Sequence, residues 1–461
     1  MAKKKPTLVP PSLDKSGGNN KSVDQPSYFL SLTVRNVRCF GDDEQKVDFS
    51  DGKGLPAKWT MLLGDNGTGK TTILQALAYF YPFFDSQPFW ATAARMRSVE
   101  TYDVLFWHMP ALRGAGDSCG SITAGLYSGA DLRGAGAPGR SGRMSLELRA
   151  DGASGFQPAV RPPLCFAYGA GRRLGTGAVT ESWRVNAMAS LYADDVPLRD
   201  AEEWLSQLDW AASQASRVQT QQQKRLEQVK DLLVRVLPDV TSIRRTAPQK
   251  ESDRPRFEFA TPYGWVRLRQ LGYGYQTMIA WMVDFASRMV ERYPDSPDPL
   301  AEPAVVLVDE IDLHLHPKWQ RELMGYLSER FPNTQFIATA HSPLIVQAAP
   351  TVNANIAVLR REGDHVVIDN KPESIRGWRV DQILTSDIYD LPTARPKEFD
   401  EAIQRRTQIL SKSRLTKRDR EELAHLEKKL DRLPAGETAS DARKLMELAK
   451  DTAELLKKHR G

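Results

Sequence analysis

The sequence predicts a three-layer α/β fold with an inserted helical arm and a C-terminal helical hairpin. Short apolar runs suited to buried strands alternate with amphipathic helical segments, which is typical of such folds. A glycine-rich loop joins one of these strands to a helix, and leucines recur at helical spacing near the C-terminus. The 461 residues are 41% hydrophobic and 26% charged, which excludes a wholly disordered or fibrous chain.

The first half of the chain begins with strand-like segments. We expect strands over 29–40 (FLSLTVRNVRCF), 59–63 (WTMLL) and 163–168 (PLCFAY), and a helix from Thr71 to about Tyr81. Residues 110–155 are rich in Gly, Ser and Ala, and this composition indicates a surface insertion around a short hairpin.

A polar, helical segment over 181–238 follows and predicts the inserted arm. Asp200 with Glu203 resembles a capping box, with Asp in place of the usual Ser or Thr. Helical spacing is carried by Leu226, Val229, Leu233 and Val236.

The second half returns to alternating strands and helices. We expect a hairpin over 256–268, a helix over 276–293, parallel strands over 304–308 and 335–340, and an amphipathic helix over 318–331. Beyond about Pro396 the chain is expected to be helical. Leu423, Leu426, Leu430 and Leu433 share a helical spacing, and the break at Leu433–Gly436 predicts a helical hairpin.

Composition also indicates the cellular compartment. The three cysteines, Cys39, Cys119 and Cys165, are far apart, which excludes a disulfide framework and fits a reducing compartment. The most apolar helix candidate is interrupted by Asp284, and no apolar run approaches a membrane span. The N-terminal lysines have no apolar segment behind them, so no signal peptide is expected. These observations predict a cytoplasmic protein.

The net charge of +5 is concentrated near the C-terminus. Residues 411–461 hold 14 Lys and Arg against 10 Asp and Glu, a difference of +4. Such a segment could contact nucleic acid, but a solvated helical surface of mixed charge is the simpler interpretation.

The sequence from Gly64 to Thr71 matches G-x4-G-K-[ST] between a strand and a helix, which is the context that a phosphate-binding loop requires. Its glycines let backbone N–H groups face a polyphosphate, and the helix adds its positive dipole end. We therefore expect ATP with Mg²⁺, with Lys70 at the β- and γ-phosphates and Thr71 on the metal. The predicted contact residues are Gly64, Asp65, Asn66, Gly67, Thr68, Gly69, Lys70, Thr71 and Thr72.

Two further strand ends carry candidate catalytic residues. Asp309 and Glu310 follow the apolar run VVLV, so we expect Asp309 on the Mg²⁺ and Glu310 at the attacking water. His341 follows the next predicted strand and could hydrogen-bond the γ-phosphate or the water, although a histidine that caps the loop would look the same. His314 and His316 have no companion ligand, so a structural loop is expected and a zinc site is not.

The segment Gly169–Gly175 also follows a strand, but it misses the G-x-G-x-x-G spacing. Arg172 or Arg173 could approach a phosphate from this segment, although an ordinary surface turn is favoured.

Taken together, the segments SLTVRNVRCFGDDEQKVDF, VLVDEIDLHLHPKWQ and FPNTQFIATAHSPLIV resemble ABC-class ATPases of the SMC, RecF and OLD type. Within that class the chain is most similar to compact bacterial anti-phage ATPases, of Septu type or associated with retrons. The resemblance implies a signature motif over LRQLGYGYQTM, where Leu271, Gly274 and Tyr275 match. Gly272 replaces a serine that contacts the γ-phosphate of the opposite subunit, which bears on the hydrolysis rate more than on binding.

The resemblance implies an ABC-type P-loop core and a homodimer, or a higher homo-oligomer, in which two heads sandwich ATP head-to-tail. Hydrolysis to ADP and phosphate would control a partner effector, expected to be an HNH-type nuclease. One alternative is a DNA-repair or DNA-tethering ATPase of RecF kind, and another is a nucleotide-stabilised scaffold with little hydrolysis. The expected segments are a disordered basic tail (1–27), an N-terminal core lobe with the P-loop and the glycine-rich insertion (28–180), a helical arm (181–240), a C-terminal core lobe (241–390) and a helical region for partner contact (391–461).

Overall fold

The computed structural model divides the chain into two compact units between Tyr389 and Asp390. The residues that it describes are 26–80, 120–129, 132, 140–149, 152–154, 163–174, 187–194, 196–214, 219–246, 256–370, 372, 375–391, 394, 397–412 and 415–430. The expected basic tail lies outside the described residues except for its last two positions, as do Cys119 and the leucines beyond Leu430.

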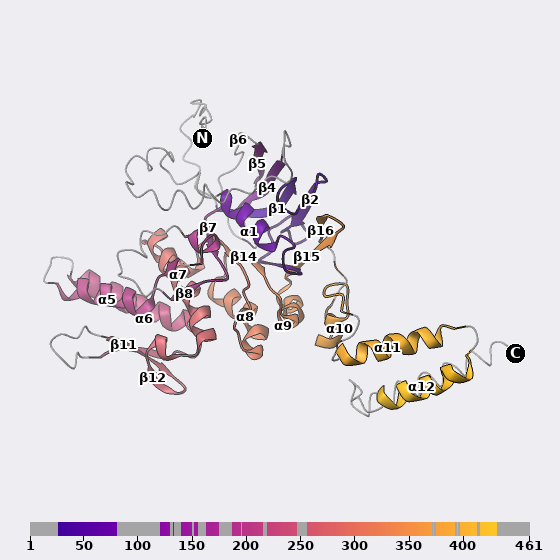
Figure 1. Ribbon diagram of the computed structural model, residues 1–461. Coiled ribbons are helices and arrows are strands. Elements are labelled where there is room, and N and C mark those ends of the chain that lie inside the picture. Colours follow the sequence, from indigo (N-terminus) through magenta and orange to yellow (C-terminus); the bar gives the residue numbers. More distant parts are fainter. Residues whose placement is uncertain are drawn as a thin grey trace, which may run out of the picture. The chain divides into compact units, whose positions relative to one another are not determined.

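A six-stranded sheet forms the centre of the first unit (Figure 1). In spatial order its strands are β16 (His365–Asp369), β15 (Asn355–Glu362), β3 (Trp59–Gly64), β14 (Thr334–Thr339), β13 (Ala304–Val308) and β7 (Cys165–Tyr168). The strands from β15 to β7 are parallel, and β16 is antiparallel to β15. Every residue of β13 and β14 is buried, which explains their continuous apolar runs. The predicted parallel strands are confirmed.

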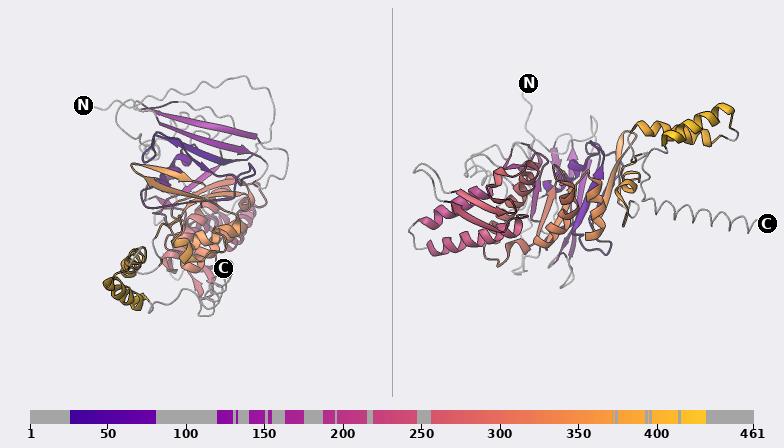
Figure 2. Two further views of the ribbon diagram at one scale, coloured as in Figure 1. Left: turned by 90° about the vertical axis from the view of Figure 1, so that its right-hand side faces the viewer. Right: turned by 90° about the horizontal axis from the view of Figure 1, so that it is seen from below.

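A second, antiparallel sheet and helix α1 (Lys70–Tyr79) cover one face of the central sheet (Figure 2). The second sheet has the order β2 (Gln45–Asp48), β1 (Ser27–Arg35), β4 (Gly120–Ser128), β5 (Arg140–Arg149) and β6 (Gly152–Ser154). The interpretation of 110–155 as a surface insertion is wrong for β4, because this strand pairs with β1 and buries Ile122, Ala124 and Leu126 in the core. A hairpin is present, but β4 and β5 together make up two of the five strands of this layer.

One buried amide joins the two sheets. The Gln335 side chain on β14 accepts a hydrogen bond from the Phe29 backbone N–H at 2.9 Å and donates one to the Phe29 carbonyl at 2.8 Å. The ladder between β1 and β4 shifts register between Phe29 and Ser31. The glutamine therefore satisfies backbone groups that a neighbouring strand would otherwise pair.

Helices cover the opposite face of the central sheet. They are α7 (Tyr273–Arg292), α8 (Pro317–Arg330), α9 (Pro343–Ala348) and α10 (Val380–Leu384), with 3₁₀ turns at Leu268–Gln270, Pro299–Ala301 and Ala349–Val352. A further 3₁₀ turn, Ala189–Leu191, packs on the face of α1. The three layers that the sequence predicts are therefore present, and a β-sheet forms much of one outer layer.

Helices α5 (Ala201–Ser213) and α6 (Gln219–Val236) lie side by side and extend from the core (Figures 1 and 2). Asp200 caps α5 by accepting hydrogen bonds from the backbone N–H groups of Glu202 and Glu203. The four apolar residues expected on one face of α6 are all buried. A three-stranded sheet of β10 (Ser242–Thr246), β11 (Arg256–Thr261) and β12 (Gly264–Val266) follows the helices, which confirms the predicted hairpin. A short parallel ladder joins β8 (Arg173–Leu174) to β9 (Pro197–Leu198).

The second unit contains α11 (Lys397–Leu410) and α12 (Lys417–Leu430), which pack as a helical hairpin. Helix α11 ends at Leu410 and α12 begins at Lys417, whereas the predicted break at Leu433–Gly436 lies outside the described residues. Ion pairs between Arg405 and Glu422 and between Lys412 and Asp419 join the two helices and the turn.

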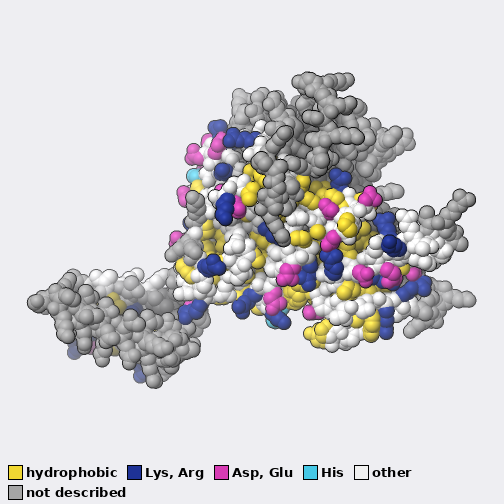
Figure 3. Space-filling model, turned by 180° about the vertical axis from the view of Figure 1, so that it is seen from behind, with side chains coloured by type: hydrophobic (Ala, Val, Ile, Leu, Met, Phe, Trp, Pro, Cys, Tyr) yellow, Lys and Arg dark blue, Asp and Glu magenta, His cyan; other side chains and the backbone are white. Residues whose placement is uncertain are grey.

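The surface seen in Figure 3 shows acidic and basic side chains interspersed rather than gathered into a field of one sign. Among the described helices, none combines the length and the apolar character needed to cross a membrane. Asp284, which interrupts the apolar stretch of α7, is fully buried. It accepts hydrogen bonds from the Tyr168 hydroxyl at 2.9 Å and from Arg288 Nε at 2.7 Å.

We expect Asp284→Ala to lower the free energy of unfolding by about 3–5 kcal/mol, because it leaves the buried Arg288 guanidinium without its carboxylate. Glu227→Ala is the matched control, since it breaks the exposed Glu227–Lys230 pair on α6 and should cost no more than about 1 kcal/mol. Urea denaturation measures both. Equal, small losses would contradict a structural role for Asp284.

Candidate nucleotide site

The candidate site lies at the carboxyl edge of the central sheet. Strands β3, β14, β13 and β7 are neighbours and run parallel, so the segments that follow them meet at one edge. These segments are the glycine-rich loop after β3, His341 after β14, Asp309 and Glu310 after β13, and Arg172 after β7. The structure therefore brings together the P-loop, both acids and the histidine that the sequence singled out.

Helix α1 begins directly after the glycine-rich loop. Gly69, its N-cap, has a φ of 86°, in the left-handed region. A Cβ at this position would lie 2.5 Å from Cys39 Sγ, so both conformation and space require glycine. The first turn of α1 contains no acidic residue, and no side chain caps it. Its N–H groups are therefore suited to an anionic group such as a phosphate.

The Lys70 side chain is mostly buried within this loop. Its ammonium donates hydrogen bonds to the carbonyls of Gly64 at 2.7 Å and Asp65 at 2.8 Å. Burial lowers the pKa of Lys70, and the nearby carboxylates of Asp309 and Glu310 oppose that shift. The ammonium thus lies at the loop, close to the acids after β13.

Thr71 and Asp309 meet across 238 positions of sequence. The Thr71 hydroxyl donates to Asp309 Oδ2 at 2.7 Å, and the Thr339 hydroxyl donates to Asp309 Oδ1 at 2.6 Å. A hydroxyl and a carboxylate in contact suit Mg²⁺, which commonly takes one or two protein oxygens together with phosphate oxygens. Within the described residues, no group of three or more His, Cys, Asp or Glu is arranged to hold a metal ion.

Glu310 has a backbone conformation unusual for its residue type, with a φ of 48°. Its backbone N–H donates to the Thr339 hydroxyl at 2.7 Å, and its carbonyl accepts from Arg172 at 2.6 Å. Its carboxylate makes no hydrogen bond to any described residue. The backbone of Glu310 is therefore fixed while its acidic group stays available.

Arg172 is a site residue for which the sequence interpretation weighed a phosphate contact but favoured a surface turn. It is only 2% exposed, so the favoured surface turn is wrong. Its guanidinium contacts carbonyls of the residues after β13, and not a side chain. An arginine in a glycine-rich turn carries no local signal for such a role. The side chain of Arg173 lies outside the described residues.

His341 is held through its backbone. Its N–H donates to Asp312 Oδ2 at 2.9 Å, and its carbonyl accepts from the Tyr389 hydroxyl at 3.0 Å. Burial raises the pKa of Tyr389, which keeps this hydroxyl protonated as a donor. The imidazole itself is exposed and makes no hydrogen bond to a described residue. His316 caps α8 instead, as its ring accepts from the Lys318 N–H at 3.3 Å.

Arg38 is a second basic residue near the site, and sequence interpretation missed it. It follows β1 with a φ of 50° and donates to Gln75 Oε1 at 2.8 Å and to the Thr72 hydroxyl at 3.4 Å. These contacts place a guanidinium beside the first turns of α1. Its position depends on the packing of β1 against α1, which the local sequence does not reveal.

The predicted signature residues lie at the start of α7, on the opposite face of the central sheet from α1. Gly272 is exposed and caps the helix without a side-chain hydrogen bond. Leu271 and Tyr275 pack against the core, and the Tyr275 hydroxyl donates to the Pro238 carbonyl. Among the described residues, no hydrogen bond joins 271–276 to 64–72.

Gly272 and Gly274 have different surroundings. A Cβ at Gly274 would lie 2.0 Å from the His314 carbonyl oxygen, whereas a Cβ at Gly272 would meet nothing within 4 Å. The His314 ring also packs edge-on against Tyr273, with ring centroids 5.1 Å apart. The start of α7 therefore rests on the loop that follows Glu310.

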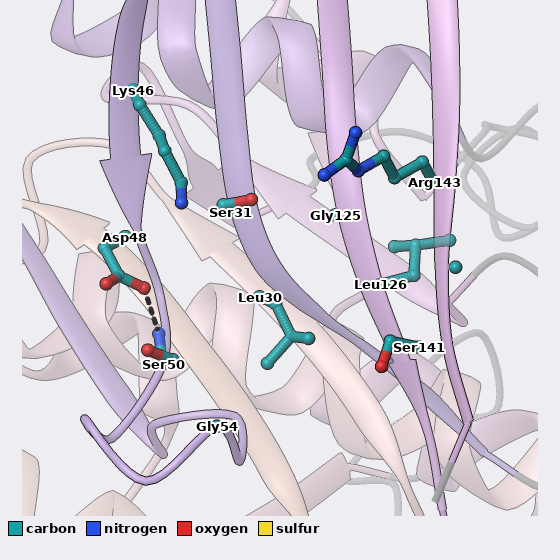
Figure 4. A pocket seen from close by; sticks show the side chains of 11 residues that line it. Leu30, Ser31, Lys46, Asp48, Ser50, Gly54, Gly125, Leu126, Ser141 and Arg143 are labelled. Carbon is teal, nitrogen blue, oxygen red and sulfur yellow. Dashed lines mark hydrogen bonds between the residues drawn. The ribbon is translucent and has the colours of Figure 1, made fainter.

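A hollow of about 400 Å³ lies on the outward face of the five-stranded sheet (Figure 4). Lys46, Ser31, Gly125 and Arg143 line it from four adjacent strands. None of its lining residues belongs to the motifs at the carboxyl edge, so the hollow is separate from the candidate nucleotide site.

The chain is similar to known ATPases. A family model described as "AAA domain, putative AbiEii toxin, Type IV TA system" matches residues 172–347, and a model described as "AAA domain" matches residues 31–86. The Septu protein PtuA of Bacillus mycoides (strain KBAB4) is 27% identical over 429 residues, covering 91% of this chain and 52% of that protein. "Retron Ec83 probable ATPase" of Escherichia coli is 33% identical over 129 residues, covering 28% of this chain and 22% of that protein.

Among solved structures, an SMC head bound to the C-winged helix domain of ScpA is 17% identical with a TM-score of 0.41, covering 74% of this chain and 97% of that chain. The chain spans about half the length of the Septu relative and less of the retron relative. The sequence matches confirm the resemblance to Septu-type and retron-associated ATPases. The fold is that of an ABC-type P-loop ATPase, as the sequence predicts.

We expect Gly274→Ser to lower the free energy of unfolding by about 1–3 kcal/mol, because the new Cβ would push against the His314 backbone. Gly272→Ser makes the same change two residues earlier, where space is open and serine is a favoured N-cap, so its effect should stay within about 0.5 kcal/mol or be stabilising. Thermal and urea unfolding of both variants measure the difference. A Gly274→Ser variant as stable as Gly272→Ser would contradict the close approach.

Proposed function

We propose that this chain binds and hydrolyses ATP with Mg²⁺, and that its nucleotide state regulates a partner nuclease or other effector in anti-phage defence. The observation that carries the ATPase proposal is the 2.7 Å contact between the Thr71 hydroxyl and Asp309 Oδ2, with Glu310 next in the chain. These are a hydroxyl after the P-loop lysine and an acid pair after a neighbouring buried strand, which is the combination that nucleotide hydrolysis uses.

The P-loop residues would bind the polyphosphate. Backbone N–H groups over Gly64–Lys70 and the start of α1 would face its oxygens, and the Lys70 ammonium would exchange the carbonyls of Gly64 and Asp65 for the β- and γ-phosphates. Thr71 and Asp309 would hold the Mg²⁺, which neutralises charge on the phosphates when bound. Thr72 would support the loop from α1, where Arg38 contacts it.

Glu310 would orient and deprotonate the attacking water. Its backbone is fixed by Thr339 and Arg172, and its carboxylate makes no hydrogen bond to a described residue, so the group is free to accept a proton. His341 would donate a hydrogen bond to the γ-phosphate or the water, with Asp312 fixing its backbone.

A second copy of the chain would complete the site. Gly272 and the first N–H groups of α7 face away from their own P-loop, and Gly272 has open space beside it. In a head-to-tail pair these groups would approach the γ-phosphate bound by the other copy. A glycine in place of serine removes one hydroxyl from that contact, which supports slow hydrolysis.

Regulation of a partner rests on the similarity to Septu and retron ATPases, and an HNH-type nuclease is the partner that this resemblance implies. The charged hairpin of α11 and α12 is our candidate for the partner contact, because it forms a unit separate from the ATPase core. We place the protein in the cytoplasm, where ATP is present and the thiols of Cys39 and Cys165 would stay reduced.

Lys70→Met should weaken ATP binding on the order of 10–100-fold, because it removes a charge-assisted hydrogen-bond donor to the phosphates. Lys53→Met removes an exposed lysine from a loop away from the motifs and should leave the affinity unchanged. Calorimetric titration with ATP and Mg²⁺ measures both. Unchanged affinity in Lys70→Met would refute the assignment of the loop.

Glu310→Gln should keep ATP bound but lower the hydrolysis rate by roughly 10²–10⁴-fold, as expected when a general base is removed. Glu322→Gln, on the exposed side of α8, is the matched control. Phosphate release under single-turnover conditions gives the rates. A wild-type protein that retains ATP but is no faster than Glu310→Gln would favour the nucleotide-stabilised scaffold instead.

Mixing two inactive variants tests the composite site. Lys70→Met removes the P-loop cation, and Gly272→Glu places a carboxylate where the partner's γ-phosphate would lie, so each variant alone should be inactive. A mixed dimer keeps one site with neither lesion, so an equal mixture should recover about a quarter of the wild-type activity if subunits exchange freely. Wild-type hydrolysis that is independent of dilution, with no recovery on mixing, would rule out the composite site but not the P-loop.

A further inference from the structure

Arg172 is a buried cation whose polar contacts all go to backbone carbonyls. One terminal nitrogen donates to the carbonyls of Gly169 at 2.9 Å and Asp309 at 2.5 Å, and the other donates to the carbonyl of Glu310 at 2.6 Å. The side chain thus joins the segment after β7 to the two residues that would hold Mg²⁺ and activate water. Within the part of the chain that the structure describes, none of the hydrogen bonds of Arg172 goes to the P-loop.

We infer that Arg172 is a positioning residue that holds the Asp309–Glu310 turn in the conformation that aims the Glu310 carboxylate. This inference rests on the proposed ATPase function and deepens it, because it assigns control of the hydrolysis step to a residue that would touch neither ATP nor Mg²⁺. Arg172 would act through Glu310 and leave nucleotide binding to the P-loop.

The geometry of the turn explains why an arginine is needed. Consecutive carbonyls of an extended strand point in opposite directions, so a single side chain cannot bind both. Glu310 has a φ of 48°, and this left-handed conformation turns the Asp309 and Glu310 carbonyls towards the same guanidinium. The planar fork of arginine donates from two separate nitrogens in a fixed geometry, whereas the three donors of a lysine ammonium all lie on one nitrogen.

The left-handed conformation also has an energetic cost that Arg172 offsets. A non-glycine residue in this region costs about 1–3 kcal/mol and persists only where its surroundings hold it. Thr339 holds the Glu310 N–H, and Arg172 holds the Glu310 carbonyl, so both ends of the residue are fixed by groups outside its own strand. The same peptide is also held by the Ile311 N–H, which donates to the Thr339 carbonyl at 2.9 Å, and by the Leu313 N–H, which donates to the Glu310 carbonyl at 3.0 Å. Arg172 adds the hydrogen bonds from the segment after β7, so its loss would loosen the turn and displace the carboxylate.

Burial of the guanidinium is difficult to explain by stability alone. Burial lowers the pKa of Arg172 to about 10, against the opposing effect of Asp309, Glu310 and Asp312, so the group stays charged at neutral pH. Its Nε is buried without a hydrogen-bond partner. Buried charges are often replaceable by apolar residues without loss of stability, which points to a functional reason for this one.

The segment that carries Arg172 is itself tightly packed. A Cβ at Gly169 would lie 2.0 Å from the Ser190 carbonyl oxygen, and one at Gly171 would lie 2.6 Å from an Asp194 carboxylate oxygen. These close approaches fix the backbone from which Arg172 extends. Arg172 therefore ties the Glu310 turn to the fixed backbone of the segment after β7.

The test compares Arg172→Met and Arg172→Lys with wild type in the full chain. We expect Arg172→Met to lower kcat on the order of 10–100-fold while KM and the ATP dissociation constant stay within about twofold, because only the hydrolysis step depends on the aim of Glu310. Arg172→Lys should recover only part of the loss, since a single nitrogen cannot reproduce the spacing of the two terminal nitrogens that donate to the Asp309 and Glu310 carbonyls. Arg199→Met is the matched control, because Arg199 is 3% exposed but pairs with Glu291, and its loss should lower stability without a specific loss of kcat.

A double variant separates positioning from other roles. In the Glu310→Gln background, adding Arg172→Met should cost little further activity, because a residue that acts through Glu310 has nothing left to position. A full additional loss, or a large loss of ATP affinity in Arg172→Met, would overturn the inference in favour of direct phosphate contact. If Arg172→Met does not fold, Arg172→Lys keeps the buried charge and decides the question, and wild-type kcat in that variant would overturn the inference.

The outcomes also separate this inference from the proposed function. Wild-type hydrolysis with an unaffected Arg172→Met variant would overturn the inference alone. A wild-type protein that neither binds nor hydrolyses ATP would overturn the proposed function and the inference together.

Discussion

The parallel register of β3, β14, β13 and β7 is the constraint on which the rest of the site depends. Val308 pairs with both Ala338 and Tyr168, so the residues one step further, Asp309 and Thr339, come to lie beside each other at the strand ends. The Thr339 hydroxyl can then donate to the Asp309 carboxylate and accept from the Glu310 N–H. A slip of one residue would turn these side chains to the other face and separate every contact of the site.

At this edge of the sheet, the groups that support the site make hydrogen bonds, whereas the two groups that would take part in hydrolysis make none to described residues. Supporting groups are satisfied: Asp312 accepts from the backbone of His341 and Ser342, and Arg172 donates to the turn before them. The Glu310 carboxylate and the His341 imidazole make no hydrogen bonds to described residues. Backbone strain and a buried cation both lower stability, but they leave the two groups that would take part in hydrolysis free to do so.

Local spacing was enough to predict the P-loop, Asp309 and Glu310, because strand, loop and following residues are adjacent in sequence. It could not reveal Arg172, Thr339 or Arg38, whose roles arise from contacts between segments far apart in the chain. The same limit applies to the fold. Glycine and serine around β4 suggested a surface insertion, whereas the alternation of Ile122, Ala124 and Leu126 was the signal of a half-buried strand. In the C-terminal unit, the leucine spacing did not reveal the hairpin of α11 and α12, and the predicted break at Leu433–Gly436 lies outside the described residues.

The two glycines at the start of α7 have different roles. Gly274 makes a close contact within its own chain, whereas Gly272 would contact a second copy. Gly274 must be glycine because the His314 carbonyl occupies the space of a side chain, and His314, with a φ of 63°, lies in the loop that continues from Glu310. A shift of the Glu310 turn would therefore press on the helix start that this chain would present to a second copy. Gly272 has no such neighbour, so nothing within its own chain prevents a serine there. If the composite site forms, glycine in place of serine at position 272 removes a hydroxyl from the contact that one copy makes with the phosphate bound by the other. Gly274 would connect that contact, through the His314 backbone, to the Glu310 turn of its own copy.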